Sequence, residues 1–260
     1  MRGPAPTDNR LLAALPAADL QRLLLHLEPV ALPLGLRIDA PGDEIAHALF
    51  MTDGIVSIVY VLEDGASTEI AVIGNEGMVG IALIMGGHSI PGYSVVQSTG
   101  HALRLPATYL QEEFERGGEF SRLLLRFAQA LVTQMAQTTV CNRYHNIEQQ
   151  LCRWLLMSLD RLSSNELHVT QELIANMLGV RREGITEAAG HLQRDSLIRY
   201  RRGHITVLDR PGLEQRACEC YRVVQRETDR LLPGPTAQAR RTPAGSTRWT
   251  RSGQRDSGPA

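Results

Sequence analysis

The chain has 260 residues, of which 43% are hydrophobic and 21% charged, and its formal net charge is −1. This is the composition of a soluble globular protein with one large domain or two ordinary ones. No apolar run approaches the roughly 20 residues that cross a bilayer, and the first 20 residues lack the apolar core of a signal peptide. We therefore expect no membrane segment and a cytoplasmic location.

Charge is distributed unevenly along the chain. Residues 1–116 contain 6 Arg and 14 acidic residues, residues 117–232 contain 16 Arg and 13 acidic residues, and residues 233–260 contain 5 Arg and 1 acidic residue. An acidic first part followed by a basic second part indicates that the second part meets a polyanion. The last segment is rich in Pro, Gly, Ser and Thr, and its composition predicts disorder from residue 232 onward.

The first part of the chain predicts short helices followed by a β-domain. Leucines at helical spacing occupy 11–27 and are interrupted at Pro16. Between residues 30 and 105, short runs rich in Val and Ile alternate with turn residues, including two Asp-Gly pairs that are hairpin signals. Several strands at this spacing favour a β-sandwich or a β-barrel.

A long helix is expected over 119–140. Residues on it at alternating steps of four and three form a short apolar heptad seam: Leu124, Ala128, Leu131, Met135 and Thr138. Such a seam packs either on its own domain or on the same helix of a second chain, and the pattern alone does not decide. Further helices are expected over 146–160 and, as one element, over 210–232.

The segment 165–209 has the pattern of two short helices and a basic hairpin. Thr170 is a suitable N-cap, and Gly179 stands where a helix ends in the left-handed conformation. Apolar residues at i, i+4 and i+7 from Ile185 mark the buried face of a second helix. Two helices around a short turn with glycine predict a helix-turn-helix.

The exposed side of this unit carries groups that recognise DNA. An Arg can bind guanine through two hydrogen bonds, and a Glu can accept from cytosine. The hairpin that follows has Arg201-Arg202-Gly203 at its turn, where arginines can touch phosphates. A helical hairpin that binds another protein is the alternative. The candidate DNA-binding residues are Thr170, Gln171, Arg181, Arg182, Glu183, Thr186, Glu187, Arg199, Arg201 and Arg202.

The stretch VTQELIANMLGVRREGITEAAGHLQRDSLIRYRRGHITV resembles the C-terminal winged helix of the CRP/FNR superfamily of bacterial transcription regulators. The resemblance extends, as an order of elements, over about 15–231. It implies an α+β chain with a cyclic-nucleotide-binding-like β-roll (11–116), a dimerisation helix (117–145) and a winged helix-turn-helix (146–231). It also implies a homodimer joined along the heptad seam, a palindromic DNA site and contact with RNA polymerase.

The resemblance implies a role for each side chain that faces DNA. The base-reading Arg-Glu pair of the family falls on Arg182 and Glu183. The second base-reading Arg falls on Glu187, and the usual Ser cap on Arg181, so we expect these two residues and Thr186 to alter the preferred operator. The remaining candidates are expected to position the backbone.

The resemblance also locates an effector pocket, over residues 74–100. Its positions fall on Gly77, Gly80, Ile81, Tyr93 and Ser94. Ile81 replaces the Glu that binds the ribose, and Tyr93-Ser94 replaces the Arg-Ser pair that binds the cyclic phosphate. Without that Arg there is no bidentate partner for a phosphate, so we do not expect cyclic AMP to bind in the usual way.

Other chemistries have less support. The four cysteines contain no C-x-x-C pair, and we expect ordinary reduced thiols, no metal and no cofactor. The family's N-terminal iron–sulfur cluster is excluded because no cysteine precedes Cys141. Haem ligation would fall to His88, His101 or a Met, and a thiol switch to Cys141 or Cys152. Motifs of hydrolases, zinc proteases and P-loop enzymes are absent, so we expect no enzyme. A cyclic-nucleotide-dependent regulator and a signalling adaptor that binds protein remain the alternatives.

Overall fold

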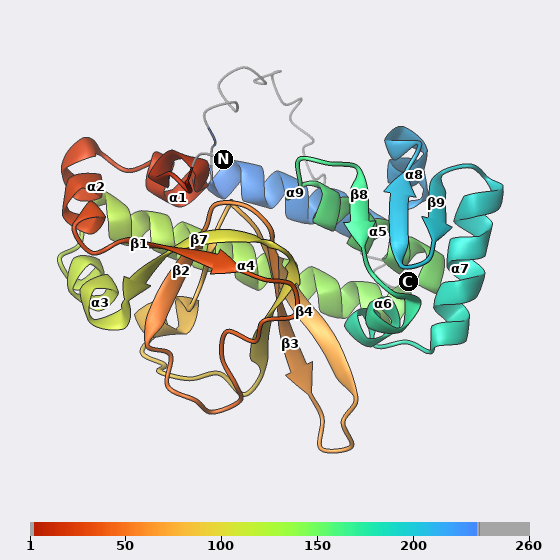
Figure 1. Ribbon diagram of the computed structural model, residues 1–260, viewed down its shortest axis with the longest axis horizontal. Coiled ribbons are helices and arrows are strands. Elements are labelled where there is room, and N and C mark those ends of the chain that lie inside the picture. The colour runs from red at the N-terminus through yellow and green to blue at the C-terminus, as the bar shows by residue number, and fades with distance from the viewer. Residues whose placement is uncertain (1–2, 233, 235–260) are drawn as a thin grey trace, which may run out of the picture.

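The N-terminal half forms a β-roll of two facing antiparallel sheets, seen in the computed structural model, which describes residues 3–232 and 234 (Figure 1). One sheet has the order β1-β7-β2-β5 and the other the order β4-β3-β6. The strands are β1 (Glu28–Leu32), β2 (His47–Met51), β3 (Ile55–Val61), β4 (Ser67–Ile73), β5 (Met78–Val79), β6 (Tyr93–Ser98) and β7 (Gly100–Pro106). The turn with Asp64-Gly65 joins the paired strands β3 and β4, as the hairpin signal predicts. The turn with Asp53-Gly54 joins β2 to β3, which lie in different sheets, so the hairpin expected there is wrong.

Short helices close the roll, and a long one runs along it. Pro16 separates the first two α-helices, because it lacks the N–H that a continuous helix needs. The helices are η1 (Pro6–Asp8), α1 (Arg10–Ala13), α2 (Ala17–Leu24), η2 (Ile81–Met85), α3 (Ala107–Glu115) and α4 (Glu119–Tyr144). Phe120, Leu124 and Phe127 of α4 are buried in the core of the roll. Among the described residues, no helix combines the length and apolar character needed to cross a bilayer.

The C-terminal half is a helical domain with a small three-stranded sheet of order β8-β10-β9. Its elements are α5 (Ile147–Leu159), β8 (Glu166–His168), α6 (Gln171–Leu178), α7 (Arg182–Arg194), β9 (Ile198–Arg201), β10 (His204–Val207), α8 (Arg210–Arg216) and α9 (Glu219–Leu231). Strand β8 was not expected; it pairs with β10 and extends the predicted hairpin. The single final helix expected over 210–232 is wrong, since the extended Ala217 separates α8 from α9.

The two halves share buried surface. Ile55, Val59 and Val72 of the roll belong to the same apolar cluster as the core of the helical domain. Helix α9 runs back beside α4 (Figure 1). Its Tyr221 lies in the helical-domain core, and its Leu231 lies in the core of the roll. The last described helix therefore completes both cores.

Candidate nucleic-acid interface

Local interactions fix the turn between α6 and α7. The Thr170 hydroxyl accepts a hydrogen bond from the Leu173 amide at 3.1 Å and so caps α6. Gly179 ends the helix with φ of 66°, a left-handed conformation that glycine adopts without strain. Helix α7 then starts after Arg181, the residue in its N-cap position. The sequence signals for both ends of α6 are confirmed.

Helix α7 presents one polar face to solvent and buries the other. Ile185, Ala189 and Leu192 are between 0% and 2% exposed and pack into the helical domain. The opposite face is exposed and consists of the five predicted residues of this helix and its cap, Arg181, Arg182, Glu183, Thr186 and Glu187. Helix α7 lies at the edge of the molecule farthest from the β-roll (Figure 1). No part of the described chain covers this face.

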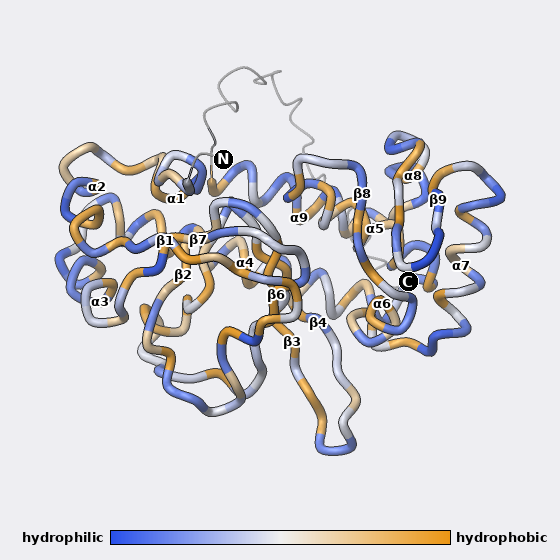
Figure 2. The backbone as a smooth tube through the Cα atoms, in the orientation of Figure 1, coloured by the Kyte–Doolittle hydropathy of each residue, from blue (hydrophilic) through white to orange (hydrophobic). Residues whose placement is uncertain are grey.

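The hairpin β9–β10 forms a basic wing beside α7. Arg202 and Gly203 make its turn with φ of 50° and 79°. A shallow hollow of about 320 Å³ on the wing is lined by Arg199, Arg201, Arg202, His204 and Thr206. The start of α7 and the wing turn both appear as hydrophilic stretches in Figure 2. The structure thus brings the predicted arginines of 181–202 together at one end of the molecule.

Few intramolecular contacts hold these polar side chains. Arg182 Nε lies 4.0 Å from Glu172 Oε2, and both side chains are 64% exposed, so this pair contributes little energy. The Thr186 hydroxyl donates to Gln171 Oε1 at 2.8 Å, which links the two helices of the motif. Arg182 therefore keeps its donors available for a ligand.

Helix α4 has an exposed apolar stripe next to the expected seam. Leu124 and Leu131 are 0% and 4% exposed and belong to the chain's own core. Thr138 accepts a hydrogen bond from Arg153 Nη2 at 2.7 Å, and Ala128 and Met135 are half-buried. The strongly exposed apolar side chains of this helix are Leu125 (54%) and Val132 (51%), one position after Leu124 and Leu131, and Val140 (42%), two positions after Thr138. The expected seam faces inward because the β-roll and α9 cover it.

A cavity of about 370 Å³ lies beside β1, β2 and the loop between them. Apolar residues of the strands and the side chains of Arg37, Arg104, Asp39, Asp43 and Glu44 line it. None of the five expected effector residues lines this cavity. Gly77 instead packs under Phe127 of α4, where an added Cβ would meet the ring at 2.2 Å. Gly80 has φ of 95° and caps η2, which begins at the half-buried Ile81.

The remaining two effector positions are occupied by contacts within the chain. The Ser94 hydroxyl donates to Asp39 Oδ2 at 2.9 Å, and the Ser94 amide donates to Asp39 Oδ1. The guanidinium of Arg37 lies 4.5 Å from the centre of the Tyr93 ring. A carboxylate thus stands where the resemblance implies a phosphate. No local sequence pattern indicated Asp39 or Arg37.

A buried carboxyl group lies between the roll and the helical domain. Glu69 of β4 is 8% exposed. Its burial raises its pKa to about 7, against opposing interactions with Ser57 and Arg153. Ser57 Oγ lies 2.5 Å from Glu69 Oε2 and 2.8 Å from Gln97 Oε1. A hydroxyl has one proton to donate, so a protonated Glu69 satisfies this chain of oxygens.

Comparison with known proteins agrees with this geometry. Residues 149–216 match the model of the Crp-like helix-turn-helix domain. Among solved structures, a putative transcriptional regulator of the CRP/FNR family from Eubacterium rectale is 19% identical, with a TM-score of 0.65 over 81% of this chain and 98% of its own. FixK2 from Bradyrhizobium japonicum is 13% identical, with a TM-score of 0.62 over 74% of this chain and 98% of its own.

A third similar structure is the c-di-GMP responsive global regulator CLP of Xanthomonas campestris. It is 17% identical, with a TM-score of 0.57 over 74% of this chain and 99% of its own. A comparison with curated proteins gives no match. The chain therefore has the fold of the CRP/FNR superfamily of transcription regulators and contains its Crp-like helix-turn-helix domain.

Proposed function

We propose that this protein is a DNA-binding transcription regulator that acts as a homodimer on palindromic sites. The observation that carries the proposal is the uncovered face of α7 beside the basic wing. Arg182 and Glu183 stand at the N-terminal end of α7, the part of a recognition helix that reaches base edges. Arg199 and Arg201 on the wing contact phosphates, which adds affinity without sequence preference.

The second copy packs on α4. Leu125, Val132 and Val140 form a stripe at steps of seven and eight residues, close to the seven-residue repeat of a coiled-coil seam. A two-fold axis along this stripe gives two copies of α7, and half-sites about one helical turn apart. At Leu125 and Val132 the proposed interface lies one position after the expected seam, because Leu124 and Leu131 are buried in the chain's own core.

The effector of this regulator is not cyclic AMP held in the usual way. The engagement of Ser94 by Asp39 supports this, because a phosphate at that position would face a carboxylate. The alternative is a regulator that depends on a cyclic nucleotide. A protein of similar structure is c-di-GMP responsive, so this alternative is tested directly. Binding of cyclic AMP, cyclic GMP and c-di-GMP, measured by calorimetry with wild type and Asp39→Asn, separates the two. Saturable binding of one of these nucleotides would support the alternative.

The main experiment is selection of genomic DNA fragments by the purified full chain, read by sequencing. Recovery of a palindrome with half-sites one turn apart supports the regulator. A protein that binds only other proteins would enrich no sequence and show almost no salt dependence on any duplex. A cytoplasmic location and contact with RNA polymerase are part of the same proposal.

A further inference from the structure

Three of the four cysteines meet at one point, with a histidine. Cys141 and His145 lie one turn apart at the C-terminal end of α4, and Cys218 and Cys220 lie at the N-terminal end of α9. The thiol and imidazole atoms of these four residues all lie within 4.8 Å of one another. The three cysteines are 0% to 4% exposed and form a cluster separate from both apolar cores. Ordinary reduced thiols were expected from the sequence, which did not predict that three of them meet a histidine.

Two distances inside the cluster match the edges of a tetrahedral metal centre. Cys141 Sγ lies 3.5 Å from Cys218 Sγ, and Cys220 Sγ lies 3.6 Å from His145 Nδ1. Ligands bound to one zinc ion at about 2.0 to 2.3 Å lie about 3.5 to 3.8 Å apart along the edges of the tetrahedron. An iron–sulfur cluster distributes its ligands over several iron atoms and keeps them farther apart. The spacing therefore fits a single ion.

Groups next to the four side chains also favour a bound metal ion. His145 turns Nδ1 toward the cysteines, and its Nε2 lies 3.3 Å from Glu219 Oε2. A carboxylate on the second ring nitrogen is the usual partner of a metal-bound imidazole. The site also lies at the negative end of the α4 dipole and the positive end of the α9 dipole, which favour a cation and thiolates respectively.

The net charge of a metal centre at this place would offset a buried positive charge. Arg153 is 5% exposed, and its Nε has no hydrogen-bond partner among the described residues. Its positive charge acts on Cys141 and Cys220. A divalent ion with three thiolates and a neutral imidazole carries one net negative charge. Such a centre compensates a buried guanidinium.

We propose that Cys141, His145, Cys218 and Cys220 bind one structural zinc ion. Three thiolates and one imidazole are a common ligand set of closed zinc sites. The ion ties the junction of α4 and α5 to the start of α9, so it fixes the DNA-binding domain relative to the long helix. Binding releases the protons of the thiols, and no oxidant or reductant is needed.

The test is the metal content of the purified full chain, measured by elemental mass spectrometry together with a thiol count. We expect about one zinc per chain, released by a mercurial reagent that blocks thiols. Cobalt added to the metal-free protein should give the visible absorption of a tetrahedral ion with thiolate charge-transfer bands. Wild-type protein that contains no metal and takes up no cobalt would overturn the proposal. A Cys141–Cys218 disulfide, or the absorption of an iron–sulfur cluster, would overturn it too.

Matched variants locate the ion. Cys220→Ser and His145→Ala should lower the zinc content, whereas Cys152→Ser should leave it unchanged, because Cys152 is equally buried but lies outside the cluster. Glu219→Gln should retain the ion with roughly 10-fold weaker affinity, by loosening His145. Its side chain is 76% exposed, so this variant folds normally. Equal zinc content in all four variants would place the metal elsewhere. None of these readouts depends on DNA binding.

Discussion

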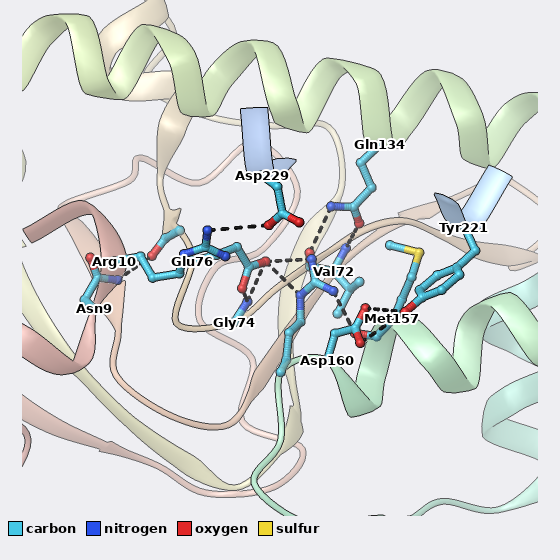
Figure 3. A network of polar contacts seen from close by, with 12 residues as sticks. Asn9, Arg10, Val72, Gly74, Glu76, Gln134, Met157, Asp160, Tyr221 and Asp229 are labelled. Carbon is cyan, nitrogen blue, oxygen red and sulfur yellow. Dashed lines mark hydrogen bonds and ion pairs between the residues drawn. The ribbon is translucent and has the colours of Figure 1, made fainter. Parts of the chain in front are cut away.

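Arg161 and Glu76 form an ion pair that joins the helical domain to the β-roll away from solvent. Arg161 Nη2 lies 2.6 Å from Glu76 Oε1, and the two side chains are 8% and 9% exposed. Glu76 also accepts from the Gly74 amide (Figure 3). Arg161 also donates to the Met157 carbonyl. The loop expected to bind an effector therefore contacts the end of α5 directly.

Removal of one partner of this ion pair should lower the free energy of unfolding. Arg161→Met leaves Glu76 buried without its counter-charge, and we expect a loss of about 3 to 5 kcal/mol in the free energy of unfolding. The double variant Arg161→Met/Glu76→Gln should recover most of the loss, because no unpaired charge remains. Urea denaturation of the three proteins measures both effects. A single variant that costs less than about 1 kcal/mol would show that the pair is solvated.

Glu69 should make stability depend on pH. Burial raises its pKa from 4.5 to about 7 in the folded chain, so the folded state binds more protons than the unfolded state between these values. Its contribution to stability is fully present below about pH 4.5 and is lost as the pH rises to about 7. Integrated over this window the loss is on the order of 3 kcal/mol. Wild type should lose stability relative to Glu69→Gln between pH 5 and 8. Parallel curves would contradict a raised pKa.

A charge on the α4 stripe should dissociate the proposed dimer. Val132→Glu places a carboxylate at the centre of the stripe, and its burial against a second copy would be unfavourable. The variant should remain folded, since Val132 is 51% exposed. Sedimentation equilibrium should show a dimer for wild type and a monomer for the variant. Leu62→Glu, at a 67% exposed position on the roll, is the control that should stay dimeric.

The two kinds of arginine should differ in what they recognise. Arg182→Ala should cost about 1 to 3 kcal/mol at the preferred operator and relax preference at one base pair. Arg201→Ala should weaken all duplexes alike and reduce the slope of log affinity against log salt by about one. Binding to a set of operator variants at several salt concentrations separates the two. Identical losses on every duplex would contradict this division.

The helix-turn-helix was predictable because its determinants are local. The Thr170 cap, the glycine in the left-handed conformation and the apolar face of α7 lie within 23 residues of one another and interact only with near neighbours in the motif. The sequence left open which element covers the α4 seam, because that depends on α9, which lies about 80 residues further along. A heptad pattern reports that a face is apolar, not which element covers it.

The site residues that sequence reasoning missed depend on long-range contacts. Cys141 and His145 at i and i+4, and the pair Cys218 and Cys220, are each visible in the sequence as half of a ligand set. Only the packing of α9 on α4 brings the halves together. Asp39 and Ser94 are likewise 55 positions apart in the sequence, so no local pattern predicts their hydrogen bond.

The position of α9 has a consequence for the order of events during synthesis. Leu231 and Leu232 fill the core of a roll whose first strand begins at residue 28. A nascent chain cannot finish its N-terminal half until α9 has left the ribosome. The roll therefore remains incomplete while the helix-turn-helix domain is synthesised, and both halves reach their final packing in one late step.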